Sequence, residues 1–171
     1  MTTEPKLIYK KFEREVWDNG DSVTKIIKYL DPNQYYGFKQ FDIDTYNKFR
    51  ESNLNFVKIR KFKIYEDRCV MEMDKIDGIN AKDYLKTASE DKIWNVCIIN
   101  YFKWIKAFLD FSKNYKQVYF HMDLNPYNVI IKDDVPYVVD PDQFSWGDKT
   151  LFITRMQKHY FQFLEYVVYK I

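Results

Sequence analysis

The chain has 171 residues and carries 27 Lys and Arg against 25 Asp and Glu, which gives a net charge of +2. A charge so close to neutral provides no global field of the kind that marks binders of nucleic acid or of membrane surfaces. Only four glycines are present. No two of them are close enough to form a GxGxxG or Walker A loop, which excludes the classical dinucleotide and P-loop sites.

Aromatic residues make up 19% of the chain. Stacking platforms for bases would explain them, but we favour the compositional bias of an AT-rich genome, such as that of a phage or another compact genome. Two cysteines without a leader and two distant histidines argue against a disulfide framework and a structural zinc site. No apolar stretch reaches the about 18 residues of a spanning helix, so we expect a protein of the reducing cytoplasm (the host cytoplasm if phage-encoded).

Strands dominate the prediction for the first half of the chain. Residues 7–30 form two β-type runs around Asn19-Gly20, a strong turn signal because both positions accept positive φ. Apolar spacing predicts a short helix over residues 38–49. Residues 56–76 alternate apolar and basic side chains before a turn at Glu66-Asp67, which indicates a second hairpin with a solvated edge strand.

Helices dominate the prediction for the second half. We expect a single unit of two lobes, a β-rich one with one helix over residues 1–78 and a mostly helical one over residues 79–171. Thr87 and Glu90 have the spacing of a capping box, and an apolar stripe at helical intervals follows for about 25 residues. An amphipathic helix is predicted over residues 151–171, so the fold class is α+β.

A β-hairpin is predicted within this second half, because the apolar runs Val129–Ile131 and Tyr137–Val139 flank a polar turn. The two ends of a hairpin lie side by side, which brings Asn128 and Asp140 together although twelve residues separate them. An amide oxygen with a carboxylate is a hard-oxygen set suited to Mg²⁺, which keeps water and phosphate oxygens as its other ligands. Asp142 is a candidate for an additional ligand.

Asp123 precedes Asn128 by five residues. The catalytic loop of protein kinases has this D-x-x-x-x-N spacing, in which the Asp accepts the substrate hydroxyl proton and the Asn holds metal. Asp140 then follows an apolar run, where protein kinases place the metal-binding Asp of DFG. Acids that only cap turns would explain the same loop. The combined register with His121 and Leu124 favours the kinase-like site.

A family resemblance rests on these motifs. H-M-D-L-N-P-Y-N over His121–Asn128, with D-P-D over Asp140–Asp142, resembles the kinase-like phosphotransferases. The similar branch holds aminoglycoside phosphotransferases, choline kinases and, most similar, lipopolysaccharide (Kdo/heptose) kinases. Protein kinases usually carry Lys at the position of Asn125, so the resemblance favours a sugar or another small molecule as acceptor. It implies a minimal, truncated member with a protein-kinase-like two-lobe fold: a small antiparallel β N-lobe and a reduced, mostly helical C-lobe.

The resemblance also implies an activity and its residues. It points to an ATP- and Mg²⁺-dependent phosphotransferase that binds ATP between the lobes and phosphorylates a hydroxyl group. Asp123 would accept the hydroxyl proton, and Asn128 and Asp140 would hold Mg²⁺. Asp142 would add a ligand or hold a water molecule. His121 would brace the loop by hydrogen bonding rather than move protons.

Further nucleotide contacts are expected upstream. The backbone of the expected hinge would hydrogen-bond adenine, at Glu72, Met73 and Asp74. Lys25 and Lys28 are both candidates for the lysine that reaches the α- and β-phosphates, and the family's pattern favours Lys28. Asp44 is the candidate for the carboxylate that pairs with this lysine, with Asp42 and Glu51 as alternatives.

Two other functions remain open. A catalytically weak or inactive nucleotide-binding module would explain why no glycine-rich loop covers the phosphates and why only 27 residues follow Phe144. A nucleic-acid-binding protein would use the basic strands and the aromatics, but the near-neutral charge and the acidic cluster oppose it. The sequence predicts neither an oligomeric state nor a catalytic role for His159.

Overall fold

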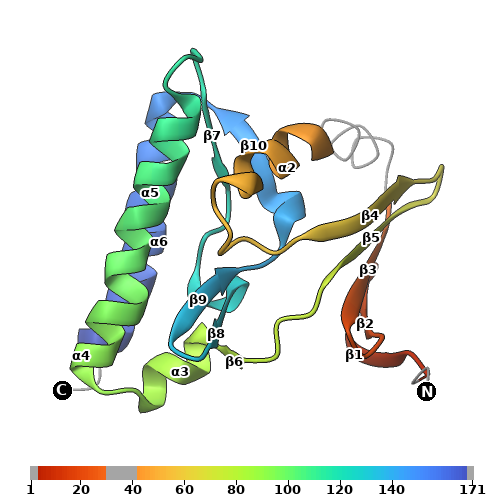
Figure 1. The fold of residues 1–171 in the computed structure, drawn as a ribbon, viewed down its shortest axis with the longest axis horizontal. Coiled ribbons are helices and arrows are strands. Elements are labelled where there is room, and N and C mark those ends of the chain that lie inside the picture. Colours follow the sequence, from red (N-terminus) through yellow and green to blue (C-terminus); the bar gives the residue numbers. More distant parts are fainter. Residues whose placement is uncertain (1–3, 30–41, 169–171) are drawn as a thin grey trace. The chain divides into compact units, whose positions relative to one another are not determined.

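A computed structural model describes residues 4–29 and 42–168, and side chains as far as residue 166. The chain divides into two compact units (Figure 1). Unit 1 comprises the described residues of Met1–Ser52 and Val57–Lys75, and unit 2 comprises those of Asn53–Phe56 and Ile76–Ile171. The first part of the helix predicted over residues 38–49 lies outside the described residues, as do the last three residues of the terminal helix.

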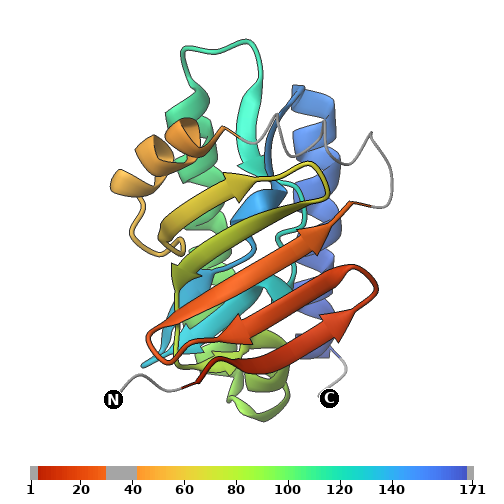
Figure 2. The same cartoon turned by 90° about the vertical axis from the view of Figure 1, so that its right-hand side faces the viewer.

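Unit 1 is built on a five-stranded antiparallel sheet, which Figure 2 shows face on. Across the sheet its strands are β1 (Lys6–Lys11), β2 (Arg14–Asp18), β3 (Ser22–Lys28), β5 (Arg68–Asp74) and β4 (Ile59–Ile64). The second predicted hairpin is confirmed as β4 and β5, and its basic strand β4 is the edge strand that we expected. The described residues of unit 1 also include the helix α2 (Ile43–Glu51), which is capped by Asp42 and buries Tyr46 and Phe49.

The first predicted hairpin contains one strand more than expected. The run over residues 7–17, predicted as a single strand, folds back on itself so that Lys11 of β1 faces Arg14 of β2. Phe12 makes this turn with φ at 50° and with 81% of its surface exposed. An aromatic residue rarely adopts positive φ, so nothing in the sequence marked the reversal. The predicted turn at Asn19-Gly20 is confirmed between β2 and β3, where Gly20 has φ at 96°.

Unit 2 combines helices with two small sheets. Its helices are α3 (Ala81–Thr87), α4 (Glu90–Lys92), the π-helical segment η1 (Ile93–Ile98), α5 (Ile99–Ser112) and α6 (Lys149–Val168). One sheet pairs β7 (Val118–His121) with β10 (Phe144–Gly147), and the other has the order β6 (Ile79–Asn80), β8 (Val129–Lys132) and β9 (Val135–Val138). Among the described residues no helix is long and apolar enough to cross a membrane.

The long helix of unit 2 begins later than the capping-box spacing predicted. Ser89 caps it by accepting a bond from the backbone N–H of Lys92 at 3.4 Å. Thr87 instead ends α3, where its hydroxyl donates to the carbonyl oxygen of Tyr84. The cap of the long helix is therefore Ser89 and not Thr87. The predicted apolar stripe is confirmed as the buried face, with Ile93, Val96, Cys97, Tyr101, Trp104 and Phe108 in the core.

Candidate active site

The predicted catalytic loop leaves the buried strand β7 and leads into β8. All four residues of β7 are buried, and its last residue, His121, faces Phe144 of β10. The loop continues through a 3-10 turn over Pro126–Asn128, whose preceding Asn125 accepts a bond from the backbone N–H of Tyr127 at 2.9 Å. The loop is thus held at both ends by strands and in its middle by its own amide side chain.

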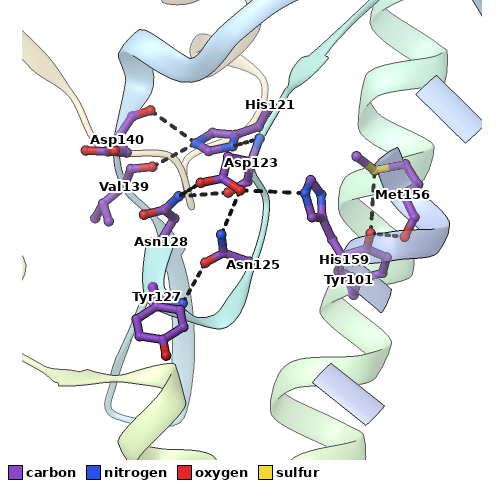
Figure 3. A network of polar contacts seen from close by, with 10 residues as sticks. All are labelled: Tyr101, His121, Asp123, Asn125, Tyr127, Asn128, Val139, Asp140, Met156 and His159. Carbon is purple, nitrogen blue, oxygen red and sulfur yellow. Dashed lines mark hydrogen bonds and ion pairs between the residues drawn. The ribbon is translucent and has the colours of Figure 1, made fainter. Parts of the chain in front are cut away.

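Two asparagines fix the carboxylate of Asp123 (Figure 3). The Nδ2 of Asn125 donates to Oδ1 of Asp123 at 2.8 Å. The Nδ2 of Asn128 donates to the main-chain oxygen of Asp123 at 2.8 Å and to its Oδ2 at 3.1 Å. The Asp123 side chain is nevertheless 49% exposed. The carboxylate is therefore oriented by the protein but still accessible to an acceptor molecule.

The predicted hairpin is present and its two ends meet. Val129 faces Val138, and the backbone N–H of Val139 donates to the carbonyl oxygen of Asn128 at 2.9 Å. Because the Nδ2 of Asn128 is turned toward Asp123, its amide oxygen points to the side where Asp140 lies (Figure 3). The hairpin thus places Asn128 opposite Val139, the residue before Asp140, and the pairing of the two side chains on one ion stays a prediction.

Asp140 has a left-handed backbone, with φ at 65° and ψ at 53°. A non-glycine residue in this region carries a cost of about 1–2 kcal/mol, although Asp tolerates it better than most residues. His121 holds the conformation, because its Nε2 lies 3.0 Å from the oxygen of Val139 and 3.1 Å from that of Asp140. Strained residues that the surroundings fix in this way are typical of functional sites.

The hydrogen bonds of His121 define its tautomer. Its Nδ1 accepts the backbone N–H of Asp123 at 3.2 Å, so the proton is on Nε2, which donates to the two carbonyl oxygens. Burial lowers the pKa of His121, while the nearby carboxylates, Asp140 first, act against this shift. The ring is fully buried and neutral. This geometry supports the bracing role that the resemblance implied.

The donor set fits a magnesium ion that shares its coordination with a bound phosphate. Within the described ranges no three His, Cys, Asp or Glu side chains gather as a metal site. The amide oxygen of Asn128 and the carboxylate of Asp140 would therefore hold the ion together with oxygens from outside the protein, which is how Mg²⁺ commonly binds beside phosphates. Asp142, in the next 3-10 turn (Pro141–Gln143), accepts a hydrogen bond at its Oδ2 from Nε2 of Gln143 at 3.2 Å.

The sequence did not single out His159, which the structure places beside Asp123. Its Nε2 lies 3.7 Å from Oδ1 of Asp123, and the ring is completely buried. Burial lowers the pKa of His159 to about 4, against the opposing effect of Asp123. A signal was available, because His159 shares the apolar face of α6 with Met156 and Phe163. Only the fold shows that this face meets the catalytic loop.

The candidate phosphate lysines lie on opposite faces of β3. Lys28 is exposed at the end of the strand, on the face that also carries Glu15 of β2, and its charge contributes to the lowered pKa of Glu15, after the larger effect of Lys10. Lys25 is only 4% exposed and faces the buried Met71 of β5. The sequence favoured Lys28 for the phosphate contact. In the structure the side chain of Lys25 is the one that its surroundings hold in place, because it is buried.

The expected hinge residues Glu72, Met73 and Asp74 form the end of β5, between β3 and β4. The backbone N–H of Asp74 donates to the oxygen of Lys58 at 2.9 Å, so it is already used within the sheet. Asp44 is exposed in the first turn of α2. Within the described part of the chain, no ion pair joins it to Lys28.

Comparisons with known proteins identify the fold. No protein-family model matches the chain, and no curated protein matches it either. The chain is similar to the kinase PK-1 of the Cydia pomonella granulovirus, with a TM-score of 0.55 and 17% identity over 84% of this chain and 53% of that one. It is also similar to monomeric WbdD, with a TM-score of 0.56 and 15% identity over 85% of this chain and 37% of that one.

At these identities the likeness shows the fold alone. The chain spans about half the length of the viral kinase and little more than a third of WbdD. The predicted fold class is confirmed: a kinase-like α+β fold with an antiparallel β-sheet in its N-terminal part and a mostly helical C-terminal part. The likeness supports the kinase-like fold that the resemblance implied, and the branch and the activity stay predictions.

Proposed function

We propose that this protein is an ATP- and Mg²⁺-dependent phosphotransferase that phosphorylates a hydroxyl group of a sugar or another small molecule. One observation carries the proposal. Asp123 is held by the amides of Asn125 and Asn128, and the oxygen of Asn128 is directed away from Asp123, on the side of the hairpin end that carries Asp140. A single loop and hairpin thus present a base, an amide ligand and a carboxylate ligand, the parts that phosphoryl transfer requires. We expect the reaction to take place in the cytoplasm.

Each residue has a proposed role. When bound, Mg²⁺ neutralises negative charge on the phosphate oxygens. Asn128 and Asp140 hold the ion, with Asp142 as a further ligand or a holder of water. Asp123 orients the acceptor hydroxyl and accepts its proton late in the transfer. His121 keeps Asp140 in its left-handed conformation, so its contribution is to position the ligand.

Unit 1 supplies the proposed nucleotide contacts. A lysine on β3, Lys25 or Lys28, would neutralise the α- and β-phosphates, and Asp44 is the proposed carboxylate near it. Adenine would bind backbone groups at or just after the hinge residues Glu72, Met73 and Asp74. The N–H of Asp74 already donates within the sheet. The N–H that donates to adenine therefore belongs to a residue after the end of β5.

A nucleotide-binding module without efficient catalysis is the second candidate. The turn between β1 and β2 carries Phe12 and Glu13, where protein kinases have a glycine-rich loop over the phosphates. This turn offers an exposed aromatic ring and a negative charge rather than a flexible run of backbone N–H groups. Binding of nucleotide without transfer or hydrolysis would favour this candidate.

Calorimetry and a transfer assay separate the two candidates. Titration with ATP, with and without Mg²⁺, measures binding, and ADP release over a panel of sugars measures turnover. We expect Asp123→Asn to keep Mg-ATP binding and to lower kcat by about 10²–10⁴-fold, the usual contribution of a general base. Asp133→Asn, in the exposed hairpin turn, is the matched control, and we expect it to leave Mg-ATP binding and kcat unchanged. Turnover that survives Asp123→Asn would refute the role of Asp123.

A further inference from the structure

A buried histidine that the proposed function does not use faces the candidate base. The ring of His159 is 0% exposed, and among the described residues neither of its nitrogens has a hydrogen-bond partner. Its Nε2 lies 3.7 Å from Oδ1 of Asp123 (Figure 3). A buried polar group without a partner carries a cost of about 1–3 kcal/mol. Such a group beside a candidate catalytic residue therefore calls for a functional explanation.

The surroundings of the ring select its tautomer. One nitrogen of a neutral imidazole carries a proton and the other a lone pair. With the proton on Nδ1, the Nε2 lone pair would face the negative Oδ1 of Asp123. With the proton on Nε2, the N–H points at that oxygen and approaches a charge-assisted hydrogen bond. The Nε2–H tautomer is therefore the favoured one.

The ring is held in place by the packing of α6 on α5. One turn before His159, the carbonyl oxygen of Met156 accepts a hydrogen bond from the hydroxyl of Tyr101 at 2.6 Å. One turn after it, the ring of Phe163 packs 5.5 Å from that of Tyr101. Tyr101 thus ties α6 to α5 on both sides of His159, and the imidazole points at the catalytic loop from a fixed helix.

The two oxygens of Asp123 are in different environments. Oδ1 accepts a bond from Asn125 and also faces His159, so both of its lone pairs have a neighbouring donor. Within the described part of the chain, Oδ2 accepts only from the Nδ2 of Asn128, at 3.1 Å. Oδ2 therefore keeps one lone pair for a hydroxyl group.

We propose that His159 is a positioning residue that holds Oδ1 of Asp123, so that Oδ2 is the oxygen that receives the acceptor proton. This inference rests on the proposed function. In the transfer, the acceptor oxygen bonds to the γ-phosphorus, the bond from that phosphorus to the leaving oxygen of ADP breaks, and the hydroxyl proton moves to Oδ2. His159 keeps its own proton throughout. The present distance of 3.7 Å shortens when acceptor binds, since catalytic hydrogen bonds are often long without substrate.

Imidazole NMR tests the contact without any activity, because the chain has only two histidines, His121 and His159. Long-range ¹H–¹⁵N spectra report which nitrogen of each ring carries the proton. We expect both rings in the Nε2–H form. Asp123→Ala shifts the Nε2 resonance of His159, whereas Asp110→Ala, at an exposed ion pair of α5, leaves it unchanged. An Nδ1–H form of His159, or a resonance that ignores Asp123→Ala, would overturn the inference.

Kinetics test the consequence for catalysis. We expect His159→Leu to lower kcat about tenfold with the KM for ATP unchanged, and His159→Gln, which keeps an N–H donor, to retain most of kcat. Since Leu removes a buried group that has no partner, Tm stays equal or rises, so the loss of activity is not a loss of folding. A kcat of His159→Leu equal to that of the wild type refutes the inference alone. A wild-type protein without transfer refutes the proposed function, and the NMR experiment then still decides whether His159 contacts Asp123.

Discussion

The Nε2 of His121 lies 3.1 Å from the main-chain oxygen of Asp140, whose φ is 65°. This contact joins the end of β7 to Asp140, the second residue after β9, and it holds a position whose φ is positive. The imidazole therefore acts through Asp140: it holds the carboxylate in a backbone conformation that the residue alone would rarely adopt.

Substitution of Asp140 separates backbone strain from charge. We expect Asp140→Asn to fold with nearly unchanged stability, because Asn also tolerates the left-handed region, and to lose at least tenfold in Mg²⁺-dependent nucleotide affinity. Asp140→Ala loses the same affinity and about 1 kcal/mol of unfolding free energy as well, the cost of that region for an ordinary residue. Calorimetry with and without Mg²⁺, together with urea unfolding, measures both. Unaltered Mg²⁺-dependent affinity in Asp140→Asn would remove Asp140 from the ligand set.

The local part of the site was predictable because it depends on short-range geometry. Two β-type runs around a polar turn must bring the two ends of the hairpin together, and the pairing of Val129 with Val138 places Asn128 opposite Val139, next to Asp140. The five-residue spacing likewise puts Asp123 within reach of Asn128. Neither inference needs to know how distant segments pack.

Contacts between distant segments were not predictable in this way. His159 lies between Met156 and Phe163 on the apolar face of α6, a pattern from which its burial was not predicted. No pattern shows that this face meets Asp123. The buried position of Lys25 depends on which face of β3 the fold covers, and the spacing of side chains does not decide that. The reversal at Phe12 lacks Gly or Asn, the usual residues at positive φ, so no residue in this run indicates a turn.

Acid should destabilise the protein through His159. Burial lowers the folded pKa of His159 to about 4 from the ordinary 6.5, and the positive charges of Lys158 and Arg155 act in the same direction. Between these values the unfolded chain binds more protons than the folded one, so stability falls as the pH drops from about 6.5 to about 4. The difference between the two pKa values corresponds to about 3 kcal/mol of unfolding free energy, which is present at neutral pH and lost in acid.

Urea unfolding at pH 7, 5.5 and 4 measures this dependence. We expect His159→Leu to flatten the slope between pH 6.5 and 4, because Leu has no proton to gain. His121, whose pKa burial also lowers, remains in both proteins, so part of the slope persists. Parallel curves for wild type and His159→Leu would show that His159 is not buried as a neutral ring.

The bond from Tyr101 to α6 gives a third prediction. The hydroxyl of Tyr101 and the oxygen of Met156 are both buried, 2.6 Å apart. We expect Tyr101→Phe to lower the free energy of unfolding by about 1–2 kcal/mol, because the Met156 oxygen is left with a less complete set of partners. Tyr115→Phe, on a ring that is 53% exposed, is the control and changes stability by less than about 0.5 kcal/mol. Equal stability of the Tyr101 variant would mean that another donor reaches Met156.

Gly78 gives the last prediction, because it lies against β8, the strand that begins directly after Asn128. A Cβ at Gly78 would lie 2.4 Å from the main-chain oxygen of Ile131 and 2.8 Å from Cγ2 of Ile130. A backbone oxygen cannot move aside as the end of a flexible side chain can, so β8 must shift. Ala also restricts the unfolded chain, which stabilises by about 0.4–1 kcal/mol, but overpacking costs about 1–3 kcal/mol and outweighs this gain.

We therefore expect Gly78→Ala to lower the free energy of unfolding by about 1–2 kcal/mol. This appears as a lower urea midpoint with an unchanged m-value. Because β8 leads directly from Asn128, the same shift should weaken Mg²⁺-dependent nucleotide binding. Lys132→Ala, at the exposed end of β8, is the control for a change on this strand that creates no clash. If Gly78→Ala is as stable as the wild type, the backbone at Gly78 does not lie as close to the oxygen of Ile131 as described. If it is destabilised with nucleotide binding intact, the position of Asn128 does not depend on this packing.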